Sequence, residues 1–543
     1  MWRVFVNPKH VPVLITGAGA AGLSLSALLA HHGVPPLLVE RRSERFVYPK
    51  ARNLSFRTLE ILRRLGVGDA VDAVADGVSG MVTRSTLNGT DEGTPLDVAG
   101  IFGGIDELSP EPPAQYCPQS RLEPILLDKT RGSGGEVRYG TELTSFAQDD
   151  DGVTAVLRDM RSGTEQTVRA DYLVAADGTH SPVREALGIR SAGHGALPIY
   201  VIFIYFRGPW RQFVPGLADG DSIHVKNATV DGIFVGTDGD LGLFITTYLR
   251  SAGETAAEFT PERCRELLNA AVGEPVDLVI VEIASWQPYE QVAERFQDGR
   301  VFLVGDAAHA MPPFKAGGAN CAIQSADNLA WKLAAVIIGQ AGAGLLRTYE
   351  VERHPVGTFS ARQSLTGPPR SFLRIDDDVP DLPLEEEQPI FALLAGYQYR
   401  SAATVPHETA PYPDEVALVD QLRGQAGTRM PHVWLERNGK RESSLDLLGA
   451  GFTVIAAGDH EDWRDATSGA SADLDVTVTF VGIGGPDGER WSAVTCLAAG
   501  EALLVRPDQF IGWRSDVRPE NGCDSREMLR GALSEILARD GCR

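Results

Sequence analysis

Apolar residues near the N-terminus fall in short runs whose spacing changes from one run to the next. Residues 11–16, VPVLIT, form an unbroken apolar run that predicts a buried parallel strand. Residues 23–31 place apolar side chains at helical spacing, and Gly33 ends that predicted helix. Residues 35–39, PPLLV, predict a second strand, which closes on Glu40. A strand, a helix and a strand in this order predict a parallel βαβ unit.

Further patterns divide the rest of the chain into three regions. Residues 170–176 and 300–304 are buried-strand patterns expected in the same parallel sheet. From about 186 to 285, β-branched and aromatic runs alternate with Pro and Gly turns, which predicts an antiparallel sheet. Its strand candidates are residues 199–206, 224–236 and 241–249. From about residue 412, strands and helices alternate again and end in a hairpin, with apolar runs at 452–456, 476–481 and 503–514.

Two apolar stretches need to be distinguished from membrane spans. Residues 11–30 are apolar or small and follow two basic residues, as in a signal peptide, but they hold three glycines at a nucleotide-binding spacing. Residues 329–346 are interrupted by Lys332 and Gln340 and fit a buried amphipathic helix. We expect neither stretch to enter a membrane.

Composition fits a packed protein of several domains. The chain has 543 residues, 43% hydrophobic and 23% charged, so about two to four domains are expected and disorder is not. A formal net charge of −23 argues against a nucleic-acid partner and against docking on anionic lipid. Six scattered cysteines, without a CxxC pair or a Cys/His cluster, indicate neither a disulfide framework nor a metal site. They fit a reducing, cytoplasmic compartment.

The three N-terminal glycines form a GxGxxG turn between the first strand and the first helix. Gly17 allows the tight turn, Gly19 lets the backbone approach a pyrophosphate, and Gly22 lets the helix pack closely on the strand. The helix N-terminus would point free N–H groups at the phosphates. Glu40 follows Gly22 by 18 residues, where an acid can accept hydrogen bonds from a ribose 2′-hydroxyl. This unit predicts a site for NAD or FAD rather than NADP.

Two later acid–glycine motifs favour FAD over NAD. Asp177-Gly178 and Gly305-Asp306 each follow a predicted strand directly. Ligands bind at the carboxyl ends of parallel strands, so both carboxylates are expected at the nucleotide site. Asp306 can accept hydrogen bonds from ribityl hydroxyls. Residues 311–320, MPPFKAGGAN, then supply a glycine-bearing approach to a flat ring.

With these motifs in this order, the chain resembles the class A FAD-dependent aromatic monooxygenases of the para-hydroxybenzoate hydroxylase type. Within them it looks most like the actinobacterial aromatic-polyketide hydroxylases, such as aklavinone and angucycline hydroxylases. The resemblance covers essentially the whole chain. Besides the motifs above, it is carried by Arg41, Ala51-Arg52-Asn53, Gln119-Ser-Arg121-Leu-Glu123, His309, Pro312-Pro313, Asn320 and Asn328-Leu-Ala-Trp331-Lys332.

The resemblance implies an α/β fold with a Rossmann-like FAD-binding domain, an antiparallel substrate domain and a thioredoxin-like C-terminal domain. The discontinuous FAD-binding domain would comprise residues 1–80, 111–185 and 286–369. The substrate-binding β-sheet domain would comprise residues 81–110 and 186–285. A connector, residues 370–411, would lead to the thioredoxin-like domain, residues 412–543. Because this last domain lacks CxxC, we expect no thiol redox role for it.

The resemblance also implies site residues. Those that would bind the cofactor are Gly17, Gly19, Ala20, Ala21, Gly22, Glu40, Arg41, Arg52, Gln119, Arg121, Asp177, Gly178, Gly305, Asp306, Pro313, Gly317, Gly318, Ala319 and Asn320. Arg52, Pro313 and His309 would take part in catalysis, although His309 equally fits a structural hydrogen-bonding role. The aromatic residues that would line the substrate pocket, each of which also fits a core position, are Tyr200, Phe203, Tyr205, Phe234, Phe244 and Tyr248.

The implied reaction is hydroxylation of an electron-rich polycyclic phenol in natural-product biosynthesis. NADPH or NADH would reduce the FAD, and O2 would form a flavin C4a-hydroperoxide that transfers oxygen to the ring. Baeyer–Villiger oxidation, epoxidation and oxidative decarboxylation share these motifs and stay open. A non-oxygenating flavin oxidase and a catalytically silent flavin-fold protein also stay open. We expect a small-molecule aromatic partner, the polycyclic phenol itself, and either a monomer or a homodimer.

Two positions depart from the family pattern. Lys315 lies in Phe314-Lys315-Ala316, where relatives usually have Thr-Gly-Gly or similar. Its cation could lie at the flavin's pyrimidine edge, contact an acidic substrate or face solvent. Ser325 stands where relatives often have aspartate. These departures bear on how the loop would hold the flavin and not on the fold.

Overall fold

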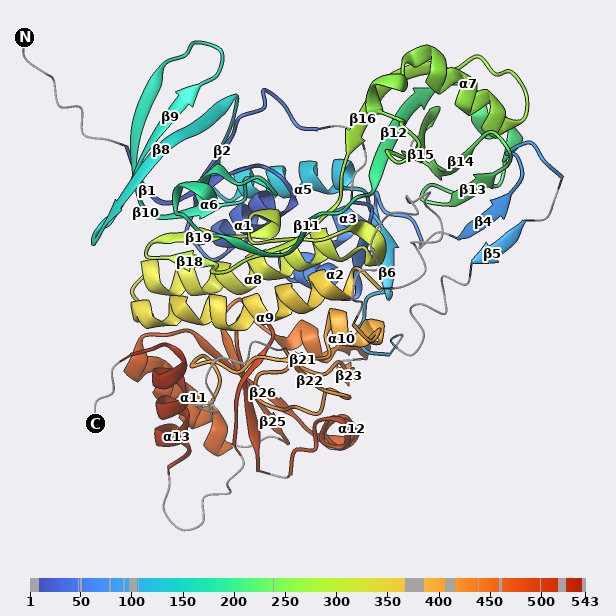
Figure 1. The fold of residues 1–543 in the computed structure, drawn as a ribbon. Helices are drawn as coiled ribbons and strands as arrows, with labels where there is room; N and C mark the ends of the chain where they lie inside the picture. Colours follow the sequence, from blue (N-terminus) through green and yellow to red (C-terminus); the bar gives the residue numbers. More distant parts are fainter. Residues whose placement is uncertain are drawn as a thin grey trace, which may run out of the picture.

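The computed structural model describes most of the chain, and its residues form three units (Figure 1). An antiparallel sheet covered by α7 (Pro261–Val272) lies beside a parallel-sheet unit, and a C-terminal unit lies under α8 (Gly317–Ile337) and α9 (Arg347–Gln363). The described residues are 9–46, 48, 51–77, 80–90, 93–96, 105, 107–237, 239–366, 385–405, 416–437, 439–458, 461–498, 500–515 and 524–539.

The parallel-sheet unit has a central sheet whose middle strands are buried on both faces. In spatial order the strands are β18 (Gln297–Asp298), β19 (Val301–Leu303), β10 (Glu165–Ala175), β1 (Lys9–Thr16), β2 (Leu37–Glu40) and β7 (Glu136–Tyr139), with β8 (Thr141–Asp149) and β9 (Gly152–Asp159) attached to β10. β19, β10, β1, β2 and β7 run parallel, so their carboxyl ends share one edge. Strand residues such as Leu14 share one core with α1 (Ala20–His31) and α8.

Shorter elements complete this unit. The helices are α2 (Phe56–Arg64), α3 (Gly68–Asp72), α5 (Gln119–Gly132) and α6 (Pro182–Ala186). β3 (Asn53–Ser55) pairs with β6 (Ala114–Tyr116). β11 (Ser191–Ala196), β17 (Tyr289–Ala293) and β20 (His309–Ala310) form a small antiparallel sheet.

The two faces of the antiparallel-sheet unit pack against different parts of the protein. Its strands run in the order β16 (Val279–Trp286), β12 (Tyr200–Arg207), β15 (Leu241–Tyr248), β14 (Asp231–Gly236), β13 (Ser222–Lys226), β4 (Met81–Arg84) and β5 (Thr94–Leu96). Residues of α7 such as Leu268 close a core on one face. The opposite face joins residues that lie outside the sheet, Tyr48 and Leu365, in a second cluster. Because strand side chains alternate, neighbouring residues of β12 belong to different clusters.

The C-terminal unit is a four-stranded mixed sheet between helices. β26 (Val478–Ile483), β25 (Phe452–Ala457), β27 (Ala502–Val505) and β28 (Ile511–Arg514) lie in this order, with β25 and β26 parallel and the other pairs antiparallel. α11 (Glu461–Leu474) and α13 (Ser525–Ile536) cover one face, and α12 (Gly485–Thr495) covers the other. The smaller elements are α10 (Ile390–Leu394), β21 (Tyr397–Gln398), β22 (Ala417–Leu418), β23 (Trp434–Arg437) and β24 (Lys440–Ser443). The predicted α/β fold class is confirmed.

The helix expected at residues 329–346 has different bounds in the structure. α8 begins earlier, at Gly317, and ends at Ile337, because Gly339 turns the chain with a φ of +79°. Of the predicted connector, residues 370–384 and 406–411 lie outside the described residues.

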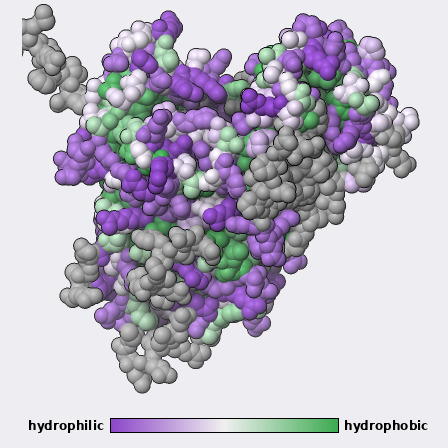
Figure 2. All heavy atoms as spheres, in the orientation of Figure 1, coloured by the Kyte–Doolittle hydropathy of each residue, from purple (hydrophilic) through white to green (hydrophobic). Residues whose placement is uncertain are grey.

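No helix in the described ranges is both long and apolar enough to cross a bilayer. The face in Figure 2 is mostly hydrophilic, with hydrophobic residues in scattered patches.

Candidate active site

The glycine turn brings the ends of β1 and β10 into close contact. A Cβ at Gly17 would lie 2.2 Å from the carbonyl oxygen of Ala176, and the φ of Gly17 is +104°. A Cβ at Gly22 would lie 1.9 Å from the carbonyl oxygen of Gly17. At Gly19, in contrast, the nearest atom would be Nε2 of Gln119 at 3.9 Å. The turn is therefore closed on its inner side and open over Gly19, where α1 begins without a side-chain cap.

Glu40 is tied to this turn. Its carboxylate accepts hydrogen bonds from the backbone N–H groups of Ala18, at 2.9 Å, and Arg42, at 3.0 Å. The neighbouring Arg41 is exposed. The acid at the end of β2 therefore lies at the glycine turn, as a ribose-binding carboxylate requires.

Asp177 carries an oxygen that is buried and has no hydrogen-bond partner. Its Oδ2 accepts from the N–H of Val183 at 3.2 Å, but its Oδ1 has no partner among the described residues. Burial raises the pKa of Asp177. Gly178 follows with a φ of +89° and turns the chain toward α6. An orphaned carboxylate oxygen beside Gly17 is the feature expected of a group that meets a polar ligand.

The third motif, Gly305-Asp306, is distant from this turn in the sequence but contacts the helix that follows it. Gly305 has a φ of +64°, and a Cβ there would lie 2.7 Å from the Cβ of Ala21. Asp306 follows on the short 3₁₀ turn η3 (Gly305–Ala307) and is exposed. Three motifs that are distant in sequence thus converge at one edge of the parallel sheet.

The start of α8 is held by the side chain of Asn320. Its Oδ1 accepts from the N–H of Ser55 at 2.9 Å and from the Thr58 hydroxyl at 2.7 Å. Its Nδ2 donates to the carbonyl oxygens of Asn53, at 3.0 Å, and Ala316, at 2.8 Å. Both donors and both lone pairs of the amide are occupied. Asn320 therefore positions the loop, and its direct contact with the cofactor stays a prediction.

The loop before α8 is partly exposed. Pro313 is exposed on η4 (Pro313–Lys315), and Gly317, Gly318 and Ala319 form the first, half-buried turn of α8. Lys315 forms an ion pair of 2.8 Å with Glu387, and only 10% of the lysine side chain is exposed. This partner accounts for the Lys315 cation, so the solvent-facing interpretation is wrong.

Arg52 is a half-buried cation near two tyrosines. Its backbone carbonyl accepts from the N–H of Cys117 at 2.8 Å, which fixes it beside β6. Burial lowers the pKa of the Arg52 guanidinium, against the influence of the Tyr116 and Tyr205 hydroxyls nearby. Within the described residues, no carboxylate or hydrogen-bond acceptor pairs with this side chain. Such a group suits an anionic ligand.

The two residues predicted at the start of α5 differ in their surroundings. Gln119 lies at the open side of the glycine turn and donates to Glu123 at 2.5 Å. Arg121 instead binds Asp76 at 2.8 Å and Asp219 at 2.7 Å, and so joins the two sheet units. Arg121 therefore forms ion pairs between the two units, and its cofactor contact stays a prediction.

Of the six pocket candidates, two lie on the sheet face toward the parallel-sheet unit. Phe203 and Tyr205 belong to that cluster, and Tyr205 stacks on Tyr48 with ring centroids 4.7 Å apart. Trp286, which we did not predict, meets Phe203 edge-on at 5.4 Å. Neither Tyr48 nor Trp286 was predicted, because no local pattern marks the first, and no strand was predicted at β16, which the second ends.

The other four candidates lie on the face covered by α7. Phe234 and Phe244 are fully buried together, at a centroid distance of 4.7 Å. Tyr200 and Tyr248 stack on each other at 5.2 Å and pack against the same cluster. These four residues pack in the core under α7, and their role as pocket-lining residues stays a prediction.

His309 is also enclosed. It is fully buried, and its Nε2 lies 3.1 Å from the Ser325 hydroxyl. The ring packs against Phe296, and a Cβ at Gly357 would come within 3.1 Å of it. These contacts fit the structural role of His309, and its catalytic role stays a prediction.

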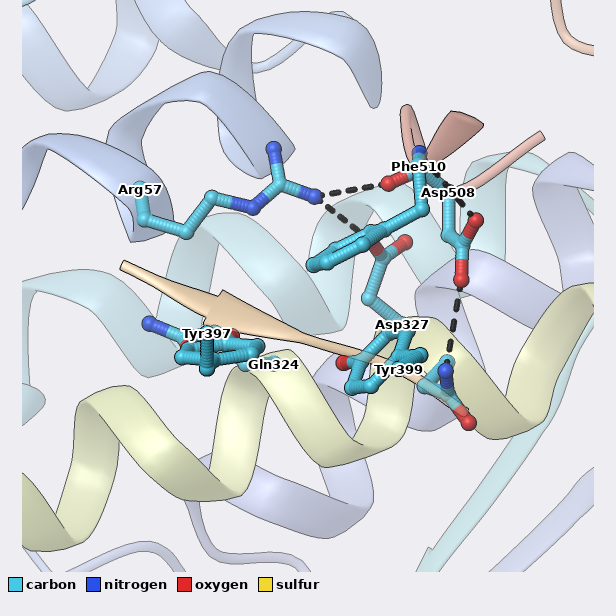
Figure 3. Close-up of a pocket in the computed structure, with 8 residues that line it drawn as sticks. Arg57, Gln324, Asp327, Tyr397, Tyr399, Asp508 and Phe510 are labelled. Atoms are coloured by element: carbon cyan, nitrogen blue, oxygen red, sulfur yellow. Dashed lines mark hydrogen bonds and ion pairs between the residues drawn. The ribbon is translucent and has the colours of Figure 1, made fainter. Parts of the chain in front are cut away.

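A buried network of polar and charged groups joins the C-terminal unit to α2 and α8 (Figure 3). Arg57 reaches Asp327 at 3.5 Å and the carbonyl oxygen of Asp508 at 2.8 Å. Asn328 donates to the Asp508 carboxylate at 3.3 Å, with Phe510 alongside. These buried contacts attach the C-terminal unit to the parallel-sheet unit.

Comparisons with known proteins agree with this arrangement. Residues 10–364 match the FAD binding domain family, and residues 423–539 match the C-terminal domain of aromatic-ring hydroxylases. The chain is 37% identical to a tetracenomycin A2 monooxygenase-dioxygenase of Streptomyces glaucescens over 98% of each chain. It is 36% identical to an aklavinone 12-hydroxylase of Streptomyces purpurascens, covering 98% of this chain and 100% of the relative.

A solved structure is similar along the same length. Aklavinone-11 hydroxylase, in a ternary complex with FAD and aklavinone, matches with a TM-score of 0.87 and 35% identity, over 98% of this chain and 100% of that one. Sequence and structure comparisons therefore agree over both matched domains. The chain belongs to the family of FAD-dependent aromatic-ring hydroxylases.

Proposed function

We propose that this enzyme hydroxylates an electron-rich ring of a polycyclic phenol, with FAD, a nicotinamide donor (NADPH or NADH) and O2, in the formation of an aromatic natural product. The observation that carries the proposal is the convergence of the glycine turn, Asp177-Gly178 and Gly305-Asp306 at one sheet edge. The substrate class is supported by similar proteins whose names cite aklavinone and tetracenomycin.

The residues at this edge fit FAD. Glu40 would bind the adenosine ribose, the N-terminus of α1 the pyrophosphate, and Asp306 the ribityl chain. Close packing at Gly17, Gly22 and Gly305 holds the turn in place, and the space over Gly19 leaves its backbone open to a dinucleotide. When bound, the flavin would store electrons from the nicotinamide and activate O2.

The protein's own part would be to bind and orient the substrate and to exclude water. Phe203, Tyr48 and Trp286 offer ring faces and edges against which a flat aromatic can stack. Burial raises the pKa of Tyr205, so its hydroxyl stays protonated at neutral pH and can donate a hydrogen bond to a substrate oxygen. Arg52 would bind the pyrophosphate of the nicotinamide donor.

We further propose that the enzyme acts in the cytoplasm, as a monomer or homodimer. Cys117, Cys264 and Cys321 are free thiols buried in the interior, which suits a reducing compartment.

The test is reduction and oxygen transfer by the purified protein. A visible flavin spectrum that bleaches faster with a nicotinamide donor when a polycyclic phenol is present, followed by label from isotopic O2 in the product, would support the hydroxylase. Hydrogen peroxide without labelled product would identify an oxidase. Protein that binds no FAD on reconstitution would overturn the proposal. The position of the label separates hydroxylation from Baeyer–Villiger insertion.

A further inference from the structure

Arg353 on α9 is a fully buried arginine surrounded by groups that are not carboxylates. Its Nε donates to the Ser325 hydroxyl at 3.1 Å, and its Nη1 to the hydroxyls of Tyr399, at 3.0 Å, and Tyr397, at 3.3 Å. Its Nη2 lies 3.3 Å from the carbonyl oxygen and 3.4 Å from the Sγ of Cys321. Within the described residues, no carboxylate lies at ion-pair distance from this guanidinium.

In the neighbouring ionic network, the positive charges outnumber the negative ones. In the part of the chain that the structure describes, it holds five cations and four carboxylates, all within the interior. These groups are Arg57, Arg64, Lys332, Arg429 and Arg506, with Glu60, Asp327, Glu352 and Asp508. Because an unpaired buried charge is costly, Arg353 requires a counter-charge of its own.

We propose that Cys321 is held as a thiolate and serves as the counter-ion of Arg353, in a buried arginine–thiolate pair that positions the first turn of α8. Of the groups that contact the guanidinium, the Cys321 thiol is the most acidic. Deprotonation neutralises the pair without adding any ligand.

His309 supports the same charge state. Its Nδ1 is buried and has no partner among the described residues. Its Nε2 lies 3.1 Å from the Ser325 oxygen and 3.8 Å from the Cys321 sulfur, and with a proton on Nε2 the ring can donate to the sulfur. The Cys321 sulfur thus lies near both the guanidinium and the imidazole ring.

The electrostatic balance differs sharply among the buried cysteines. Burial alone would raise the pKa of Cys321, but His309 and Arg353 lower it to about 6, and the Ser360 hydroxyl also contributes. Burial raises the pKa of Cys117 to about 12 and that of Cys264 to about 11. The Tyr349 hydroxyl on α9 donates to the Leu303 carbonyl oxygen at 2.7 Å, and burial keeps it protonated by raising its pKa.

The pair is placed to affect the cofactor site. Cys321 directly follows Asn320, whose amide holds the loop, and Gly317 to Ala319 form the preceding turn. The proposed arginine–thiolate pair does not depend on the proposed function. Its expected effect on FAD binding does rest on that function.

Infrared spectroscopy of the FAD-loaded enzyme tests the charge state, because S–H groups absorb in a region free of peptide and flavin bands. At mildly alkaline pH, Cys321→Ser should leave the S–H intensity unchanged, while the matched controls Cys117→Ser and Cys264→Ser each remove a band. In the wild type, a new band should grow on acidification through a pH of about 6. Loss of a band in Cys321→Ser, or no growth in the wild type, would overturn the proposal.

A rescue experiment tests the role of the pair. Cys321→Ala should lower the thermal midpoint and weaken FAD binding by about tenfold, on the order of one strong interaction. Ser325→Asp in that background should restore both, since position 325 already contacts Arg353, whereas the neutral Ser325→Asn should not. Equal rescue by both variants would show a packing role only. Loss of oxygen transfer with a normal S–H result would count against the proposed function alone.

Discussion

The Glu40 carboxylate accepts a hydrogen bond of 2.9 Å from the backbone N–H of Ala18, so the acid that ends β2 and the glycine turn that ends β1 form one surface. Ala18 lies in the turn that follows β1, and Glu40 is the last residue of β2, which pairs with β1 in parallel. Their contact orients the carboxylate before any ligand arrives, which reduces the ordering cost of binding.

Replacing this acid should weaken cofactor binding. Glu40→Gln keeps the size of the side chain but loses charge-assisted hydrogen bonds, so the Kd for FAD should rise by about tenfold or more, given roughly 1.5–3 kcal/mol per such bond. Fluorescence titration of the apoprotein measures this. Glu44→Gln, an exposed carboxylate on the following loop, is the control and should bind FAD normally.

Gly305 should tolerate no side chain. Gly305→Ala places a Cβ 2.7 Å from that of Ala21, in addition to the strain of a φ of +64°. Gly188 has nearly the same φ, +65°, but an added Cβ there meets nothing within 4 Å. Gly188→Ala should therefore cost about 1–2 kcal/mol from backbone strain alone, and Gly305→Ala should cost clearly more and also lose FAD. Chemical denaturation compares the two, and equal losses would argue against the close approach.

Arg52 should act on reduction rather than on cofactor retention. Arg52→Ala removes a cation that has no partner in the described part of the chain, so flavin content should stay normal while reduction by the nicotinamide slows by about tenfold or more. Anaerobic stopped-flow absorbance follows this step, with the exposed Arg161→Ala as control. Unchanged reduction would remove Arg52 from the proposed donor site.

The two faces of the antiparallel sheet should respond differently to the same truncation. Phe234→Ala opens the core under α7 and should cost about 3–5 kcal/mol of unfolding free energy. Phe203→Ala, on the half-buried opposite face, should cost less stability and mainly raise the KM for the aromatic substrate. Steady-state kinetics and denaturation of both variants decide this, and a KM change confined to Phe234→Ala would reverse the assignment of the faces.

The Cys321 thiolate should make stability depend on pH. Its pKa is about 6 in the folded protein, against an ordinary value of 9.0. Between these values the unfolded chain binds a proton that the folded one does not, so the contribution is complete above 9.0 and is lost as pH falls through about 6. The stability difference between wild type and Cys321→Ser should shrink accordingly in urea titrations. A difference that stays constant with pH would contradict a thiolate.

The sequence by itself determined the nucleotide-binding edge. Gly17, Gly22, Asp177 and Gly305 were identified from local patterns, because a tight turn or a close backbone approach demands glycine whatever the rest of the chain does. The apolar strand patterns that precede these residues were also recognised from neighbouring positions alone. Parallel strands then bring their carboxyl ends together by geometry alone.

Only the tertiary structure decided which side chains face the site. Alternation along β12 separates Phe203 from its neighbours, yet nothing in the strand says which face α7 will cover. The same holds for Arg121 and Asn320, whose partners come from distant segments. Local sequence fixes backbone conformation, whereas burial and pairing depend on which surfaces meet when the whole chain has packed.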